Sequence, residues 1–172
     1  FTRGDAMNFW HRVMVALGAL AALAGCDPAR VARLEEGVST EADVKKQFGE
    51  PTAVFPNADG SRTFEYTRQP AGQENYFITI GADGKMASLR QVLKASELAK
   101  VVAGMDKDQV RRLIGRPAKS VKFDLKPDEE HWDWRWLDGQ QSKVFTATVT
   151  PEGKVIKTAV IDDPATAMPG GK

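Results

Sequence analysis

Cysteine is nearly absent from this chain: Cys26 is the only one among 172 residues. A single cysteine excludes any disulfide bond within the chain. Histidine is scarce as well, and His131 is the only histidine beyond the first 26 residues. Beyond those residues there is also no apolar run of the roughly 20 residues that a membrane-spanning helix needs. The sequence therefore excludes a disulfide scaffold and offers no second hydrophobic segment as a membrane anchor.

Sequence signatures of catalysis are missing too. The chain has no G-x-S-x-G elbow for a nucleophilic serine and no glycine-rich phosphate loop. His131 lies in the acidic segment DLKPDEEHWD, residues 124–133, most of which we expect to form a loop between two strands. A metal ion needs ligands that converge in space, and one histidine in such a loop is more typically solvated. We therefore predict that the protein is not an enzyme and has no catalytic residues, no metal and no cofactor.

Net charge is missing from the part of the chain that follows residue 25. Setting residues 1–25 aside leaves 22 basic and 22 acidic side chains in 147 residues. Nucleic-acid-binding domains carry a clustered excess of lysine and arginine, so we expect no nucleic-acid partner. A chain of this length suits one domain or two small packed units.

The N-terminal end carries the pattern of a bacterial lipoprotein. A weakly basic start containing Arg12 precedes Val13–Leu23, a run without charge. The run is too short to span a bilayer but matches the apolar core of a signal peptide, typically about 7–15 residues. It leads into Leu-Ala-Gly-Cys, ending at Cys26, which resembles the lipobox of bacterial lipoproteins. We predict that residues 1–25 are upstream residues and a signal peptide, and that Cys26 carries acyl chains that bind the membrane.

The predicted anchor places the protein in the bacterial cell envelope. Asp27, directly after the cysteine, resembles the signal that keeps enterobacterial lipoproteins in the inner membrane. Because that signal also depends on the next residue, here Pro28, both the inner and the outer membrane stay open at this point.

Internal similarity divides the rest of the chain into two copies. The segment GVSTEADVKKQFGEP, residues 37–51, recurs as GMDKDQVRRLIGRP, residues 104–117. Further on, GADGKMASLRQVL from Gly81 is echoed by TPEGKVIKTAVID from Thr150. The chain after the signal peptide thus divides into a first repeat, a second repeat and a disordered tail, over residues 26–95, 96–161 and 162–172.

Each copy has the pattern of two helices. The first helices are expected over Pro28–Glu36 and Glu97–Ala103, the latter with Ser96 as its N-cap. The second helices lie within the repeated segments. Asp106 with Gln109 resembles a capping box, Thr40 with Asp43 is a looser version of one, and Gly49 and Gly115 close the two helices.

After each helix pair the apolar residues alternate, which predicts strands, and Asp-Gly pairs between them are strong hairpin signals. The expected strands are Thr52–Phe55, Arg62–Thr67, Asn75–Ile80 and Lys85–Val92 in the first copy, and Lys119–Phe123, His131–Leu137, Lys143–Thr150 and Lys154–Ile161 in the second. The predicted fold class is α+β, with two tandem ααβββ(β) repeats whose helices cover one face of antiparallel sheets.

The segments GVSTEADVKKQFGEP and GMDKDQVRRLIGRP resemble those of the SmpA/OmlA/BamE family of bacterial lipoproteins. That family usually has one copy per chain, so the duplication is a departure from it. The resemblance implies a lipid-anchored envelope binding module that assists outer-membrane protein assembly or envelope integrity. It also implies partners in the β-barrel assembly machinery and favours the outer membrane, facing the periplasm.

The tandem arrangement also resembles the β-lactamase inhibitor protein family, in which two such units form a concave sheet. The cysteine pairs of that family are absent here. This second resemblance implies an alternative function, a periplasmic protein inhibitor or ligand-binding module that uses a concave sheet face.

One candidate partner face can be named from the strands. Trp132, Trp134 and Trp136 alternate along one predicted strand and so share a face, and Phe64 and Tyr66 have the same parity in the equivalent strand. Tryptophan is enriched at protein-binding hot spots, which favours an exposed platform. Apolar character shared by equivalent positions favours a core beneath the helices, and both interpretations stay open.

Overall fold

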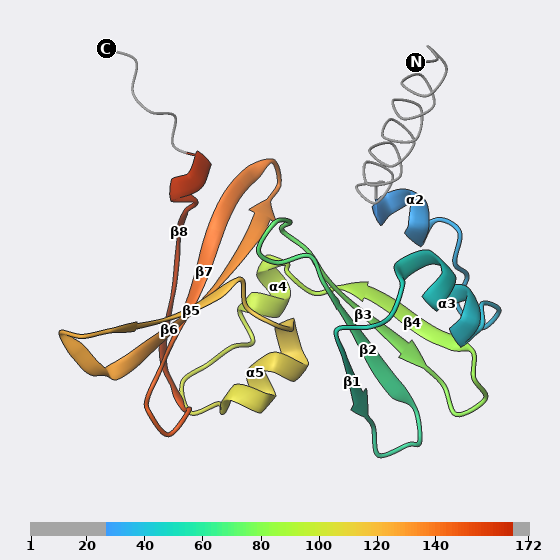
Figure 1. Cartoon of the computed structure of the whole chain (residues 1–172), viewed down its shortest axis with the longest axis horizontal. Helices are drawn as coiled ribbons and strands as arrows, with labels where there is room; N and C mark the ends of the chain where they lie inside the picture. Colours follow the sequence, from blue (N-terminus) through green and yellow to red (C-terminus); the bar gives the residue numbers. More distant parts are fainter. Residues whose placement is uncertain (1–26, 167–172) are drawn as a thin grey trace, which may run out of the picture. The chain divides into compact units, whose positions relative to one another are not determined.

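The computed structural model of the chain describes residues 27–166 (Figure 1). The chain divides into two compact units, residues 1–34 and 35–172. The described part of the first unit contains the short helix α2, Asp27–Val31. All other helices and strands described below belong to the second unit.

The second unit consists of two four-stranded antiparallel sheets and a few short helices, which confirms the α+β class. Each sheet keeps its strands in chain order, β1-β2-β3-β4 and β5-β6-β7-β8. Helix α3, Glu41–Phe48, precedes the first sheet, whose strands are Ala53–Pro56, Arg62–Thr67, Asn75–Ile80 and Met86–Gln91. The second sheet follows helices α4, Ala95–Leu98, and α5, Lys107–Ile114, and its strands are Lys119–Phe123, Lys126–Asp138, Gln141–Val149 and Val155–Asp162. A 3₁₀ turn, Pro164–Thr166, comes after them.

The two longer helices begin with capping boxes. At α3, the Thr40 hydroxyl accepts the Asp43 N–H at 3.2 Å, and the Asp43 carboxylate accepts the Thr40 N–H at 2.9 Å. At α5, Asp106 and Gln109 exchange the same two hydrogen bonds at 2.8 and 2.9 Å. These bonds satisfy N–H groups that have no partner inside the helix, which fixes where each helix begins. Both helices end at the predicted glycines.

The first helix of each pair is shorter than predicted. Helix α2 ends at Val31, and α4 begins after Lys94, so the prediction of Ser96 as its N-cap is wrong. The chain leaves its helical path early because it pairs with a strand instead. The Gly37 N–H donates to the carbonyl of Met86 at 2.7 Å, and the Gly104 N–H donates to that of Val155 at 2.8 Å.

The first sheet has its strands within one residue of the predicted bounds. In the second sheet, β6 begins at Lys126 and not at His131, so most of the predicted loop at residues 124–130 is strand. The reason is pairing with β5, in which Lys122 lies opposite Glu130, and only Asp124 and Leu125 are left for the turn. The prediction of a disordered tail from residue 162 is wrong as far as Thr166, and residues 167–172 lie outside the described part.

Helices α4 and α5 lie between the two sheets, as Figure 1 shows. One side of α5 packs Val110 and Ile114 into an apolar cluster with Trp134 and other side chains of the second sheet. From the same helix, the Arg112 guanidinium lies 5.1 Å from the ring centroid of Phe55 in the first sheet. Helix α5 therefore contacts both sheets and joins them.

A polar seam of Glu65, Asn75, Arg111 and Arg116 completes this contact. Glu65, fully buried on β2, accepts hydrogen bonds from the Arg111 guanidinium at 3.1 Å and the Arg116 N–H at 2.5 Å. Asn75, fully buried on β3, donates to the carbonyls of Ile114 at 2.8 Å and Arg116 at 3.1 Å. Backbone groups at the end of α5, which have no partner within the helix, are thus bound by the first sheet.

Candidate functional site

The predicted partner face is part of the core. Phe64, Tyr66, Trp134 and Trp136 are between 0 and 4% exposed, and Trp132 is half-buried. The prediction of an exposed platform is therefore wrong for these four side chains, and the alternative prediction of a core beneath the helices is correct. Strand alternation groups residues on one face correctly, but it does not show which face a helix covers.

Two of these aromatic side chains donate hydrogen bonds to carbonyls at the ends of helices instead of facing solvent. The Tyr66 hydroxyl donates to the carbonyl of Gly49 at 3.0 Å, and the Trp134 ring N–H donates to that of Gly115 at 3.0 Å. Trp132 packs against α5, since the Lys107 ammonium lies 4.9 Å from its ring centroid. A partner could reach these groups only if the helices moved away.

The predicted lipidation residue, Cys26, lies outside the described residues, as does the predicted signal peptide. Within residues 27–166 no helix is both long and apolar enough to cross a bilayer. The anchor stays a prediction from sequence.

The second sheet carries a groove on the face opposite to its tryptophans. Strand alternation places Asp133 and Arg135 there, between the tryptophans of β6. The groove has a volume of about 480 Å³. Its lining comes from all four strands of the second sheet, from the β2–β3 connection and from the end of the chain: Pro70, Ala118, Lys119, His131, Asp133, Arg135, Val144, Thr146, Ile161, Asp163, Pro164 and Ala165. We call it the helix-free groove.

Most charges in the helix-free groove are paired within the protein. Arg135 binds the buried carboxylate of Asp163, with 2.8 Å between Nε and Oδ2, and Ser142 donates to the same oxygen at 2.8 Å. Burial alone would raise the pKa of Asp163, but the hydrogen bonds from Arg135, the Ala165 N–H and Ser142 hold that pKa below its ordinary value. Ile161, by contrast, stays 54% exposed and gives the groove an apolar rim.

Gln69, in the connection between β2 and β3, holds one end of the groove. Its side-chain amide donates to the carbonyl of Arg135 at 2.7 Å and accepts the Arg135 N–H at 3.1 Å. These two bonds take the place of backbone pairing with a neighbouring strand, because the pairing of β5 with β6 stops before Arg135. The sequence gives no sign of this contact, because Gln69 and Arg135 are far apart along the chain.

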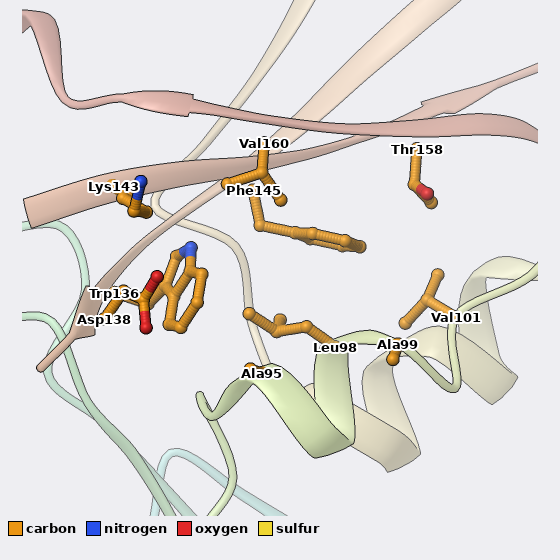
Figure 2. A pocket seen from close by; sticks show the side chains of 10 residues that line it. All are labelled: Ala95, Leu98, Ala99, Val101, Trp136, Asp138, Lys143, Phe145, Thr158 and Val160. Atoms are coloured by element: carbon orange, nitrogen blue, oxygen red, sulfur yellow. The ribbon is translucent and has the colours of Figure 1, made fainter.

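A second cavity lies between α4 and the tryptophan face of the second sheet (Figure 2). Its volume is about 360 Å³. Most of its lining is apolar, with a polar end near Lys143 and Asp138, and the lining side chains are Ala95, Leu98, Ala99, Val101, Trp136, Asp138, Lys143, Phe145, Thr158 and Val160. We call it the α4 pocket. The sequence gives no sign of this pocket, because the pocket depends on how α4 packs on the sheet.

The acidic segment around His131 makes local pairs. Glu130 accepts hydrogen bonds from the Lys107 ammonium at 2.7 Å, from the Trp132 ring at 2.6 Å and from the Ser120 hydroxyl. Burial alone would raise the pKa of Glu130, but these three bonds lower it to about 2. Among the residues that the structure describes, no three His, Cys, Asp or Glu side chains gather as a metal ion would need.

Comparison with known proteins gives little to add to this geometry. The chain matches no protein-family model and no curated protein sequence. A DUF4309 family protein (YjgB) from Bacillus subtilis is similar over 76% of this chain and 82% of its own, with 19% identity and a TM-score of 0.29. An extracellular protein containing a SCP domain from Bacillus anthracis is similar over 77% of this chain and 45% of its own, with 14% identity and a TM-score of 0.30. These TM-scores are too low to transfer a fold or a function, so the chain is similar to both proteins only in this limited sense.

Proposed function

We propose that the protein is a lipid-anchored envelope binding module that assists outer-membrane protein assembly or envelope integrity, and that it binds a protein partner at the helix-free groove. The groove carries this proposal. It is an open sheet face, no helix covers it within the described residues, and its exposed Ile161 lies beside charges that are already paired. Interfaces combine exposed apolar side chains of this kind with neighbouring polar groups.

The duplication in the sequence supports a fold of two tandem ααβββ repeats. Matching backbone contacts occur at corresponding places in both halves. Thr40 forms an isolated bridge with Lys85, and Asp106 forms one with Lys154. The aromatic contacts with the glycines that end α3 and α5 also match. In this proposal both repeats share one design, and only the second keeps its helix-free face open, because α5 packs on that face of the first sheet.

Membrane attachment through Cys26 supports the envelope setting. The acyl chains would hold the protein at the bilayer, and the outer membrane, facing the periplasm, is the location that the SmpA/OmlA/BamE resemblance favours. Asp27 keeps the inner membrane as the alternative. The protein acts by binding and not by catalysis in this proposal, and neither a cofactor nor a nucleic acid takes part.

The test is a crosslinking pulldown from envelope membranes with four forms of the full chain. The native chain should recover β-barrel assembly proteins, and Cys26→Ser should lose them with the anchor. Ile161→Arg should lose them while the protein stays in the membrane, because the charge would fill the apolar rim of the groove. Val54→Arg is the matched control, since Val54 is 45% exposed on the first sheet and should bind as the native chain does. Failure of the native chain to recover these proteins would refute the assembly role.

The alternative function is a periplasmic inhibitor that binds its target through the same groove. The open sheet face supports this alternative equally well. In that case Ile161→Arg would abolish inhibition of a purified periplasmic enzyme, and Cys26→Ser would leave the inhibition unchanged. The contrasting effects of these two substitutions therefore separate the two functions.

A further inference from the structure

Strand β8 leaves one edge of the second sheet open. Among the described residues, Lys157 to Asp162 pair with β7 alone, whereas Val155, at the start of β8, also bonds to Gly104 and Met105. After Val155, every residue of β8 is exposed, and Ile156, Val160 and Ile161 are 44, 50 and 54% exposed. Natural proteins usually protect such an edge, because its unpaired N–H and C=O groups attract another strand.

The register shows which backbone groups face outward. The Asp163 N–H donates to the carbonyl of Ser142 at 3.0 Å, which makes these two residues a hydrogen-bonded pair. Bonded and non-bonded pairs alternate in an antiparallel ladder, so Ile161 and Ala159 point their backbone groups at β7. The backbone groups of Asp162, Val160 and Thr158 point away from β7.

The α4 pocket opens beside the same outward-facing residues. The side chains of Thr158 and Val160 line it from β8, as Figure 2 shows, and Leu98 and Val101 line the opposite side. A strand added to β8 would therefore place every second side chain over this pocket. The volume of about 360 Å³ lies in the range of cavities that bind ligands, and an aromatic side chain is small enough to enter.

A buried donor at the pocket has no acceptor. The ring N–H of Trp136 is buried and makes no hydrogen bond with any described residue, although Trp136 is only 4% exposed. Its neighbour across the strands is Lys143, whose ammonium pairs with the exposed Asp162 at 3.2 Å. That pair engages the Lys143 ammonium and offers no acceptor to the indole N–H. Buried donors are normally satisfied, and this one indicates that an acceptor is brought by a bound partner.

We propose that β8 is a docking edge for an extended segment of the protein partner. The segment pairs with the outward backbone groups of Thr158, Val160 and Asp162, and it inserts one tyrosine side chain into the α4 pocket, where the hydroxyl oxygen accepts the Trp136 ring N–H. Its sequence alternates apolar residues, facing the pocket, with polar residues on the other face. The inference rests on the proposed binding function and names how the partner is held, since β8 borders both the α4 pocket and the helix-free groove.

The test uses a synthetic peptide with capped ends, Lys-Thr-Val-Thr-Tyr-Thr-Val-Thr-Lys, and calorimetry measures its binding to the full chain in detergent. Thr158→Pro removes an outward N–H, and edge strands tolerate proline. Thr158→Ala loses the same hydroxyl and keeps the N–H, so it is the matched control. We expect Thr158→Pro to bind the peptide about tenfold more weakly than Thr158→Ala, as the loss of one backbone hydrogen bond implies.

Two further measurements keep the proposal testable if Thr158→Pro folds poorly. A peptide N-methylated along one edge should not bind the native chain, and the unmodified peptide should slow amide exchange at Val160 and Asp162. Equal binding of both peptides, or no change in exchange at these amides, would overturn the proposal. A dimer that Thr158→Pro abolishes would also overturn it, because the edge would then be occupied by a second copy of the chain.

The outcomes separate this inference from the proposed function. If Thr158→Pro recovers the same envelope proteins as the native chain, the docking edge is wrong and the binding function stands. If the peptide binds β8 as expected but the native chain recovers no β-barrel assembly proteins, the docking edge stands and the assembly role is wrong.

Discussion

Gly49 and Gly115 show how two residues with the same backbone conformation can have different neighbours. Both end a helix at φ +82°, with ψ of −161° and −170°, a region that is almost restricted to glycine. A Cβ on Gly49 would meet nothing within 4 Å. A Cβ on Gly115 would lie 2.8 Å from the amide nitrogen of Asn75 and 3.2 Å from a carboxylate oxygen of Glu65. Gly49 is therefore required by its backbone angles alone, whereas Gly115 is required both by its backbone angles and by its close contact with the polar seam.

This difference predicts two unequal effects of alanine. Gly49→Ala should lower the free energy of unfolding by about 1–3 kcal/mol, the cost of the backbone strain alone. Gly115→Ala should cost about 1–3 kcal/mol more, because it also displaces the buried Asn75 from its two carbonyl partners. Urea unfolding followed by circular dichroism measures both values. Equal losses for the two variants would contradict the close packing at Gly115.

The lowered pKa of Glu130 predicts that the stability of the protein depends on pH. Its pKa is about 2 in the folded protein against an ordinary value of 4.5, because Lys107, Ser120 and Trp132 donate hydrogen bonds to the carboxylate. A pKa lowered by folding stabilises the protein above pH 4.5, and this stabilisation is lost as the pH falls from 4.5 towards 2. The loss should be about 3 kcal/mol.

The measurement is the free energy of unfolding between pH 2 and 7 for the native chain and for Glu130→Gln. The variant should be less stable at pH 7 and should lose less stability on acidification, because its amide cannot titrate. Asp128→Asn, an exposed carboxylate on the same strand, is the control and should follow the native curve. A native curve and a Glu130→Gln curve that run parallel would show that Glu130 does not carry the effect.

At the scale of helices and strands, local signals explain most of what the sequence predicts. Strands β2, β3 and β5 have the predicted bounds, because turn residues and alternation fix a hairpin locally. Helices α3 and α5 were predicted by their caps and terminal glycines. Helices α2 and α4 are shorter than predicted, because the chain after each of them pairs with β4 or β8, far along the sequence.

The candidate site was harder to predict for the same reason. The alternation of Trp134 and Trp136 showed that they share a face, but the burial of that face depends on α5, which packs there from a distant part of the chain. The parity of Arg135 placed it on the opposite face, where the helix-free groove lies. Its partners Gln69 and Asp163 could not be predicted, since contacts between distant segments leave no periodic pattern.

The end of α5 gives a prediction for a whole element. Asn75 binds the carbonyl of Ile114, the last residue of α5, and that of Arg116 just beyond the helix. Asn75→Ala should leave both without this partner and cost about 1–3 kcal/mol, the usual penalty for an unsatisfied buried group. Hydrogen exchange should also show faster opening of the last turn of α5 than of α3. Asn57→Ala, which removes hydrogen bonds confined to the first hairpin, is the control and should leave exchange in α5 unchanged.

At the scale of the molecule, the polar seam and α5 connect the two sheets. Glu65 and Asn75 are buried polar residues whose side chains bond to the other half of the chain, so separation of the sheets would expose them to solvent without those bonds. Phe77, on the same face of the first sheet, is 1% exposed and packs edge-on against Phe55, which lies beneath Arg112. We expect burial of this kind to make the two sheets one cooperative unit and to hold Gln69 in place at the helix-free groove.

The final prediction is that both sheets unfold together. The two tyrosines, Tyr66 and Tyr76, lie in the first sheet, and beyond Trp10 every tryptophan lies in the second. In a Trp10→Phe chain labelled with fluorotyrosine, ¹⁹F NMR therefore follows the first sheet while tryptophan emission follows the second. The two urea transitions should coincide.

Glu65→Ala should shift both transitions to lower urea and reduce the free energy of unfolding by about 2–4 kcal/mol, because it leaves Arg111 and the Arg116 N–H without their buried partner. Glu50→Ala, whose side chain is 77% exposed, should shift neither. Separate transitions in the Trp10→Phe parent would show that the seam does not couple the sheets, and the groove would then lack a fixed boundary at Gln69.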